Sequence, residues 1–369
     1  MHSYEVTSEA HESALERLGW DSQFAADFEP HRQDGYMPGR VAVEHKSAFV
    51  VYGGMGVLSA QPSGRFRHEA APEELPSVGD WVAVSDAGPG RGVIHAVLPR
   101  RTKFSRKMAG FETTEQILAA NIDIAFLVSA LMDDLNLRRI ERYLTTAWAS
   151  GATPVVLLTK ADLFENTSES LAAVEQAAPG TSVHLVSGVT GLGLDEIRAH
   201  LRPNRTATML GSSGVGKSTL INALMGKEYF ATAGVRWDGR GRHTTTHREL
   251  VLVPGGGLII DTPGLRELQL WDTSEGLDET FQDIEALARE CKFNDCLHER
   301  EPGCAVRTAV ADGRLTEARF SSYKKLEREY AHLETKRNAR ARAEQKRRHR
   351  KLTKAYRAQT KVIKTRGRG

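Results

Sequence analysis

The sequence predicts an α/β fold, with a small β-barrel before it and a helical, cysteine-containing region after it. Three observations predict this. From Asn121 onward apolar strands alternate with helical patterns, and a glycine-rich loop joins a strand to a helix at 211–218. Before Asn121, turn signals separate short apolar runs, which is typical of a barrel. All three cysteines lie within the 14 residues from Cys291 to Cys304.

Length and charge set limits on the chain as a whole. With 369 residues, of which 40% are hydrophobic, we expect two or three domains. The net charge of +3 conceals an asymmetry, because residues 336–369 hold 15 Lys or Arg and one acid, or +14. The remaining 335 residues hold 35 basic and 46 acidic side chains, or −11. An acidic body with a basic tail indicates a polyanionic partner.

No segment of the sequence predicts export or membrane insertion. Residues 1–19 are acidic and polar, unlike a signal peptide. No apolar run approaches the roughly 18 residues that span a bilayer. An odd number of clustered cysteines argues against a disulfide framework and for a metal site in a reducing compartment. We therefore expect a cytoplasmic, monomeric protein that does not contact membranes.

The first 38 residues predict a helical extension that packs on the body through Leu15, Leu18, Trp20 and Phe24. Residues 39–108 have the strand and turn spacing of a small barrel, and an OB-fold fits. Basic side chains near its loops and its end predict contact with nucleic acid; the alternative is a solvated surface on some other barrel. These residues are Arg65, Arg67, Arg100, Arg101, Lys103, Arg106 and Lys107.

Residues 109–275 form the predicted α/β domain. An amphipathic helix, 137–148, follows the first apolar strand and carries several arginines. Open α/β sheets bind ligands at the carboxyl ends of their strands. Four of the five predicted strands are followed directly by a segment that resembles a nucleotide-binding motif. The predicted strands are 122–130, 154–158, 183–186, 206–210 and 257–260.

The loop Gly211-Ser212-Ser213-Gly214-Val215-Gly216-Lys217-Ser218 matches the P-loop pattern G-x-x-x-x-G-K-[ST], and Thr219 continues into the helix. Glycines let backbone N–H groups surround a phosphate chain, and the helix N-terminus adds partial positive charge. Lys217 would reach the β- and γ-phosphates, and the Ser218 hydroxyl would ligate Mg²⁺. A chance match is the alternative, which the strand–loop–helix context disfavours.

The tetrapeptide Thr159-Lys160-Ala161-Asp162 follows a predicted strand and resembles the N-K-x-D motif of GTPases. The carboxylate of Asp162 can accept two hydrogen bonds from guanine that adenine cannot offer, which disfavours ATP. Ser187-Gly188 resembles the S-A-K loop, whose backbone amide meets guanine O6. Thr159 and Gly188 depart from the usual Asn and Ala. Loss of the Asn amide, which ties this loop to the P-loop, is expected to weaken affinity.

The stretch Asp261-Thr262-Pro263-Gly264 completes a D-x-x-G motif, in which Asp261 would hold the Mg²⁺ shell and the Gly264 amide would meet the γ-phosphate. In ordinary GTPases the P-loop precedes the guanine motifs, whereas here the guanine motifs come first. The order therefore predicts a circularly permuted P-loop GTPase domain. The segment after Gly264 leads directly into the next domain, so nucleotide state can be transmitted to that domain.

Between the P-loop and Asp261 lies a Gly- and Arg-rich segment, 238–246, that includes His243 and three threonines. One threonine would cap Mg²⁺; our choice is Thr245. Leu265 stands where many GTPases have a water-orienting Gln. Because leucine cannot orient water, we expect slow hydrolysis unless another group acts, and His243 is the candidate. The alternative for His243 is an ordinary residue of a solvated loop.

The residues Cys291, Cys296, His298 and Cys304 have the spacing C-x₄-C-x-H-x₅-C, a Cys₃His set for structural zinc. Four protein ligands leave no open position for catalysis. The alternative is three free cysteines and a surface histidine. Residues 276–335 therefore predict a mostly helical zinc-binding domain, and 336–369 predict a basic tail that binds RNA phosphates.

Together these motifs resemble the RsgA (YjeQ) family over about residues 36–335, and 241–246 is similar to that family's switch I signature. The resemblance implies a bacterial GTP hydrolase that acts in late assembly of the 30S ribosomal subunit. It also implies binding to 16S rRNA and stimulation of GTP hydrolysis by that subunit. The implied ligands are GTP or GDP, Mg²⁺ and one structural Zn²⁺.

Two other functions stay open. An RNA-binding scaffold could use GTP as a structural or regulatory ligand with little turnover, which Leu265 favours. A transport or DNA-linked ATPase is the third possibility, and Asp162 argues against it. Turnover with and without the subunit separates the first two, and competition by ATP tests the third.

Overall fold

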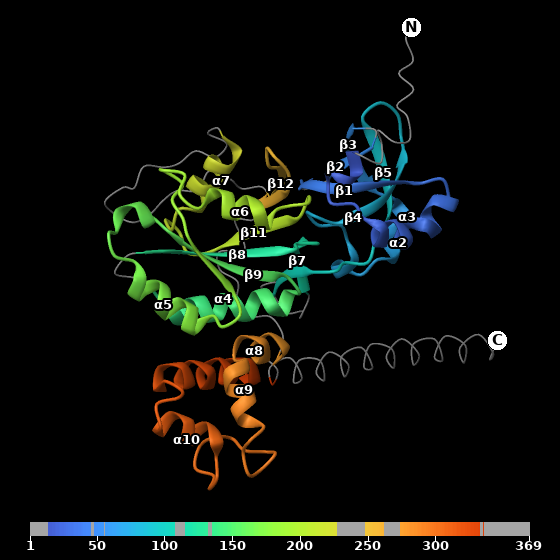
Figure 1. Cartoon of the computed structure of the whole chain (residues 1–369). Helices are drawn as coiled ribbons and strands as arrows, with labels where there is room; N and C mark the ends of the chain where they lie inside the picture. Colours follow the sequence, from blue (N-terminus) through green and yellow to red (C-terminus); the bar gives the residue numbers. More distant parts are fainter. Residues whose placement is uncertain are drawn as a thin grey trace, which may run out of the picture.

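The structure is a computed structural model, and it describes residues 14–45, 48–54, 56–107, 115–131, 135–226, 248–261, 274–332 and 335. A barrel lies beside one end of a sheet that helices cover on both faces, and a helical region lies beneath that sheet (Figure 1). Among the described residues, no helix has the length and apolar character needed to cross a membrane.

A helix at the N-terminal end of the described chain packs on the barrel. This helix, α2 (Ser22–Gln33), starts at Asp21, whose carboxylate accepts hydrogen bonds from the backbone N–H groups of Gln23 and Phe24. The ring centroid of Trp81, a buried barrel residue, lies 4.6 Å from that of Trp20 and 5.7 Å from that of Phe24. Aromatic packing therefore holds the N-terminal segment on the barrel.

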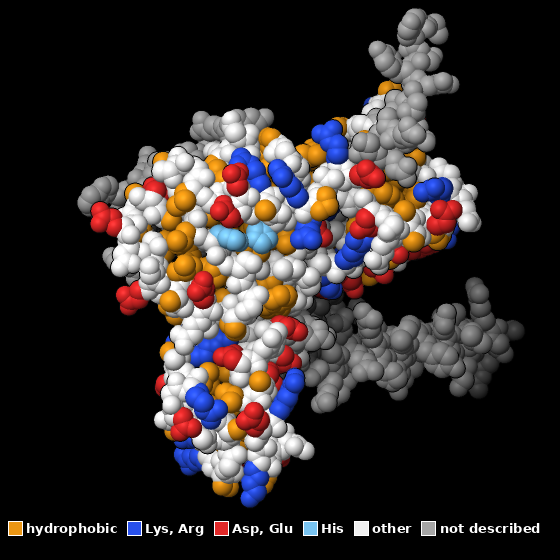
Figure 2. All heavy atoms as spheres, in the orientation of Figure 1, with side chains coloured by type: hydrophobic (Ala, Val, Ile, Leu, Met, Phe, Trp, Pro, Cys, Tyr) orange, Lys and Arg blue, Asp and Glu red, His pale blue; other side chains and the backbone are white. Residues whose placement is uncertain are grey.

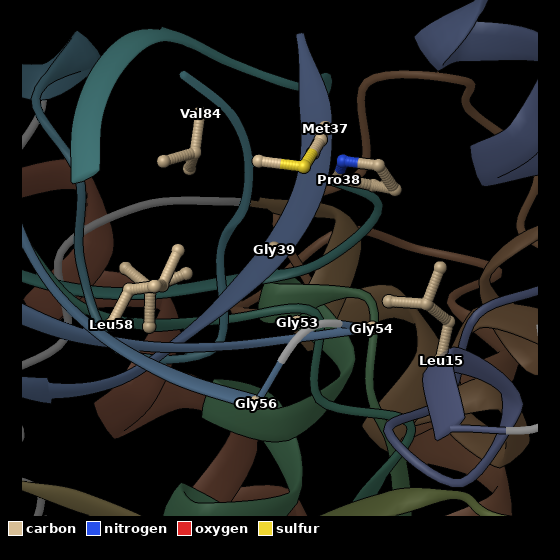
Figure 3. Close-up of a pocket in the computed structure, with 10 residues that line it drawn as sticks. Leu15, Met37, Pro38, Gly39, Gly53, Gly54, Gly56, Leu58 and Val84 are labelled. Carbon is tan, nitrogen blue, oxygen red and sulfur yellow. The ribbon is translucent and has the colours of Figure 1, made fainter. Parts of the chain in front are cut away.

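Five strands close the N-terminal barrel, and this confirms the predicted fold for that region. Their order is β1-β2-β3-β5-β4, and β4 pairs back onto β1. A small apolar cavity of about 80 Å³ lies at one end, between Leu15 of the N-terminal segment and the barrel residues Met37, Leu58 and Val84 (Figure 3). The bounds are β1 (Met37–Glu44), β2 (Phe49–Gly53), β3 (Gly56–Pro62), α3 (Gly64–Glu69), η1 (Pro72–Glu74), β4 (Trp81–Asp86) and β5 (Arg91–Val97).

The α/β domain is built on five parallel strands in the order β10-β9-β8-β11-β13, with β12 antiparallel at the β13 edge. The hairpin of β6 and β7 leads into it from the barrel. Val43 of β1 pairs with Glu249 of β12, which joins barrel and domain in one sheet. The strand bounds are β6 (Lys103–Lys107), β7 (Glu115–Ala120), β8 (Ile124–Ala130), β9 (Thr153–Thr159), β10 (Ser182–Leu185), β11 (Thr206–Leu210), β12 (Glu249–Leu252) and β13 (Leu258–Asp261).

Helices cover both faces of this sheet, because side chains alternate in direction along each strand. In β8, Phe126 packs on the face of α6 and α7, while Leu127 packs on the face of α4 and α5. Figure 1 shows the two pairs of helices on opposite sides of the strands. Their bounds are α4 (Leu137–Ser150), η2 (Ala161–Leu163), α5 (Ser168–Ala177), α6 (Leu194–His200) and α7 (Lys217–Met225).

The C-terminal region has its own core, in which Phe281, Ile284, Val306 and Leu326 are buried. It consists of α8 (Ser274–Thr280), α9 (Gln282–Ala288), α10 (Ala305–Ala311) and a helix over 317–332. Helix α8 crosses α4 so closely that a Cβ at Gly276 would lie 2.3 Å from the backbone oxygen of Thr145. Only glycine permits this contact between the two regions.

A buried network also joins the C-terminal region to the α/β domain. The guanidinium of Arg319 donates to Glu141 Oε1 of α4 at 2.9 Å and to Asp283 Oδ1 of α9 at 2.8 Å. Its remaining donors reach the backbone oxygens of Ala177 and Thr280, both at 2.8 Å. Burial raises the pKa of Glu141, and hydrogen bonds from Ser322 and Arg319 oppose that rise. The network therefore fixes α4 against the helix 317–332.

Arg40 of β1 performs the same task where the N-terminal segment, the barrel and the α/β domain meet. Its side chain is 2% exposed and donates to three backbone oxygens: those of Leu18, Gly79 at 3.3 Å and Asn121 at 3.0 Å. Burial lowers the pKa of Arg40 to about 10, so the side chain stays charged at neutral pH.

Arg40→Met should lower the free energy of unfolding by about 2–4 kcal/mol. The substitution removes the described donor of two buried carbonyls, those of Leu18 and Asn121, at about 1–3 kcal/mol each, and it removes the desolvation cost of one charge. The Gly79 oxygen keeps a donor, because the side-chain amide of Asn121 lies 3.2 Å from it. Urea denaturation followed by tryptophan fluorescence measures the effect. Arg65→Met, at a side chain that is 85% exposed, is the control and should leave the midpoint unchanged. Equal midpoints for the two variants would contradict this role of Arg40.

Candidate nucleotide and metal sites

The P-loop turns tightly between β11 and α7. Its first glycine, Gly211, lies against β8, since a Cβ there would be 2.4 Å from the backbone oxygen of Val128. Gly214 and Gly216 have φ angles of 79° and 101°, in the left-handed region that favours glycine. No side chain caps the first turn of α7, so its N–H groups face the loop, as an anion-binding nest requires.

The lysine of the P-loop is held across the loop. Lys217 is 8% exposed, and its Nζ donates to the backbone oxygens of Gly211 at 2.7 Å and Ser212 at 2.6 Å. Ser218 follows in the first turn of α7, and Asp261 ends β13, the strand that pairs with β11. A hydroxyl and a carboxylate thus stand at the same edge of the sheet, and both are oxygen ligands of the kind Mg²⁺ accepts.

The predicted guanine loop follows β9. Lys160 adopts a left-handed φ of 61°, and the Ala161 N–H donates to the Val186 oxygen at 3.3 Å, which joins this loop to the Ser187 loop. Asp162 is exposed, as a carboxylate that meets a ligand must be. In the neighbouring loop the Ser187 Oγ accepts hydrogen bonds from the N–H groups of Val189 and Thr190, both at 3.2 Å.

Thr159 stands where GTPases usually have Asn, and this replacement was expected to remove the contact between the guanine loop and the P-loop. The structure shows that Thr159 makes this contact itself. Its Oγ1 contacts the backbone oxygen of Val215 in the P-loop at 2.5 Å, and that of Ser129 in β8 at 3.3 Å. A hydroxyl therefore replaces the amide as the donor that ties this loop to the P-loop. The motif spacing does not indicate this contact, because it depends on β9 and β11 flanking β8.

The structure also explains why glycine, and not the usual alanine, occupies position 188. A Cβ at this position would lie 3.0 Å from the backbone of Thr219, in the first turn of α7. The absent side chain thus lets the Ser187 loop pack against the start of the P-loop helix. The P-loop and both guanine loops therefore converge at one edge of the sheet. His243, Thr245 and Gly264 lie outside the described residues.

The four predicted zinc ligands lie together. Their ligand atoms are all within 4.8 Å of one another. The distance from Cys291 Sγ to Cys304 Sγ is 3.9 Å, and His298 Nδ1 lies 3.6 Å and 3.4 Å from these sulfurs. Zn–S bonds of about 2.3 Å in a tetrahedron place sulfurs roughly 3.8 Å apart, so the cluster fits zinc. Burial lowers the pKa of His298, which favours the neutral imidazole that ligates metal.

Five of the seven basic residues that were expected to contact nucleic acid have side-chain partners within the protein, and two of these, Arg100 and Arg101, join different segments. Arg100 Nη2 lies 2.7 Å from Asp80 Oδ2, and the Asp80 side chain is fully buried. Arg101 pairs with Asp21 at 2.5 Å and covers the ring of Phe24 at 3.6 Å. These two arginines thus fasten the barrel and the N-terminal helix.

Comparisons with known proteins agree with this geometry. The sequence model of the RsgA GTPase family matches residues 97–271. The chain is 50% identical to the small ribosomal subunit biogenesis GTPase RsgA of Opitutus terrae, over 86% of this chain and 90% of that protein. Its counterpart from Streptomyces coelicolor is 46% identical, over 92% of this chain and 93% of that protein.

Solved structures show the same fold. YjeQ from Thermotoga maritima superposes with a TM-score of 0.63 at 28% identity, covering 81% of this chain and 98% of that one. YloQ, described as a circularly permuted GTPase, superposes with a TM-score of 0.61 at 25% identity, covering 82% of this chain and 96% of that one. The predicted permutation is therefore confirmed at the level of fold.

Thr159→Val should weaken GDP binding by about 1 kcal/mol, roughly fivefold in Kd, because the Val215 carbonyl loses its donor. Thr159→Ser and Thr159→Asn each retain a donor and should bind nearly as wild type does. Fluorescent GDP titration measures all four proteins. Wild-type affinity in Thr159→Val would show that the hydroxyl does not support the site.

The purified protein should carry about one zinc per chain, and Cys296→Ser should lose it and unfold the loop around it. Asp295→Asn, a neighbouring change that removes no ligand, should keep the metal. Elemental analysis gives the zinc content, and limited proteolysis reports the loop. Zinc-free wild type, prepared without chelators, would refute the assignment.

Proposed function

Because the chain belongs to the RsgA GTPase family, we propose that it binds the small ribosomal subunit late in assembly and hydrolyses GTP there. One observation carries the proposal. The P-loop and two guanine loops meet at one sheet edge, in a chain 50% identical over 86% of its length to a protein named for small-subunit biogenesis. Binding to 16S rRNA, a monomeric state and a cytoplasmic location are part of the proposal.

Each site residue has a proposed task. The carboxylate of Asp162 accepts hydrogen bonds from the guanine edge, and Lys160 lies along the base. The N–H groups of the P-loop hold the phosphates, and the ammonium of Lys217 offsets charge on the β- and γ-phosphates. Ser218 and Asp261 are the proposed ligands of Mg²⁺, which would neutralise charge that develops on the phosphate oxygens.

The hydrolytic step requires residues beyond the described ones. We propose that Thr245 completes the Mg²⁺ shell and that the neutral imidazole of His243 accepts a hydrogen bond from the attacking water. Gly264 would donate its N–H to the γ-phosphate. The small subunit would stimulate turnover by contacting this segment, whose arginines are attracted to RNA phosphates.

The deciding experiment measures GTP turnover by the full chain alone and with purified small subunits, large subunits and whole ribosomes. We expect slow turnover alone and stimulation by the small subunit. Small-subunit binding without stimulated turnover would favour the RNA-binding scaffold instead.

Asp162→Asn should weaken GTP binding by about 2–4 kcal/mol, because an amide replaces one of the two acceptor oxygens with a donor. Asp195→Asn is the control, since the side chain of Asp195 is 96% exposed on α6. Calorimetric titration with GTP, and with ATP as competitor, measures both variants. Tight GTP binding by Asp162→Asn, with ATP still excluded, would disprove the guanine assignment.

A further inference from the structure

A groove of about 450 Å³ runs between α4 and the helix 317–332. Its cationic lining residues are Arg138, Arg139 and Arg142 of α4 and Lys325 of the facing helix, and none of the described residues that line it is acidic. We call this the basic groove. Figure 2 shows both basic and acidic side chains where the C-terminal helical region meets the sheet-containing body.

Acidic side chains near the basic groove are already engaged. Glu141 lies beneath it, 4% exposed, and accepts hydrogen bonds from Arg319 and Ser322. On the helix 317–332, Glu327 pairs with Lys324, and Glu329 pairs with Arg142 at 2.6 Å. Arg138 and Lys325 are exposed, one on each helix. The groove therefore presents positive charge to solvent from both walls.

The two walls are held in place before any partner binds. The buried contacts of Arg319 with Glu141 and Asp283 fix α4 against the C-terminal region. Asn136, which also lines the groove, caps α4 by accepting a hydrogen bond from the Arg139 N–H at 3.1 Å. A preformed groove binds with less loss of conformational freedom than one that must assemble.

The lining favours a nucleic-acid backbone over a protein. Among the described residues that line the groove, Leu326 is the one aliphatic side chain and none is aromatic, whereas the energetic centres of protein interfaces are rich in Trp and Tyr. Contacts to RNA phosphates come from Arg and Lys together with amide groups, and the groove has these types in its four cations and Asn136. Two cationic walls suit a chain of phosphates.

We propose that the basic groove binds the phosphate backbone of RNA in the small ribosomal subunit. The proposal rests on the proposed function and names one surface that would carry out its RNA contact. The groove spans α4 and the C-terminal region, so the bound RNA would contact both. Because α4 follows β8, between the strands that carry the P-loop and the guanine loop, this contact begins beside the nucleotide edge.

The test replaces the two exposed cations together, as Arg138→Gln with Lys325→Gln. The control, Arg198→Gln with Arg328→Gln, removes the same charge from α6 and from a position of the helix 317–332 that does not line the groove. Arg328 is 73% exposed and lies outside the groove lining. Arg138→Lys with Lys325→Arg keeps the charge and should behave as wild type. Basal GTP turnover and thermal stability should be unchanged in all three variants.

Binding to purified small subunits and to protein-free small-subunit RNA is measured from 50 to 300 mM KCl with a non-hydrolysable GTP analogue. Each lost phosphate contact lowers the slope of log K against log salt by about one, so the groove variant should lose about two. The control should keep the wild-type slope. An unchanged slope in the groove variant overturns the inference.

Two further outcomes separate this inference from its premise. If the groove variant binds whole subunits more weakly but protein-free RNA as wild type does, the partner is a ribosomal protein and the inference fails alone. If wild-type protein does not bind the small subunit, the proposed function fails and the inference fails with it.

Discussion

The arrangement of this protein depends on a buried positive charge at the point where three segments meet. Arg40 belongs to the first barrel strand, yet its guanidinium binds backbone oxygens of the N-terminal segment, the barrel and the start of the α/β domain. A buried guanidinium is stable only when its donors are satisfied, so the three segments must be placed together. The barrel is therefore held at one end of the sheet and cannot turn freely on a linker.

A second buried arginine performs a comparable task at the opposite side of the α/β domain. Arg319 binds a carboxylate of α4 and one of α9, while α8 packs on α4 through Gly276. The nucleotide-binding domain therefore lies between two regions that are both fastened by buried contacts. Transmission of the nucleotide state to the C-terminal region stays a prediction from the order of motifs along the chain.

The permutation leaves the nucleotide edge intact because the edge depends on strand neighbours and not on chain order. Strands β9, β8, β11 and β13 lie side by side, and their carboxyl ends bring the loops together. β8 supplies a wall for the P-loop at Val128 and an acceptor for Thr159 at Ser129. A strand that carries no recognisable motif thus also supports the site.

The sequence alone determined the features that depend on local chemistry. The glycines of the P-loop, the carboxylate of Asp162 and the spacing of the four zinc ligands are recognisable because each needs particular residue types at short range. The alternation of strands and helices predicted the α/β domain, and turn spacing predicted the barrel. The structure and the solved structures that resemble it confirmed the predicted α/β domain and barrel.

Only the tertiary structure decided the role of residues whose partners are distant in the sequence. The sequence does not tell whether a basic residue is exposed or makes structural hydrogen bonds inside the protein. Arg40, Arg100 and Arg319 make such bonds, and their partners lie far from them in the sequence. From the sequence, Thr159 predicts a weaker contact between the guanine loop and the P-loop. In the fold, its hydroxyl reaches the Val215 carbonyl of the P-loop. The basic groove likewise exists only because folding places α4 against a helix some 180 residues later. Residue pairs this distant leave no periodic pattern in the sequence, so only the fold reveals them.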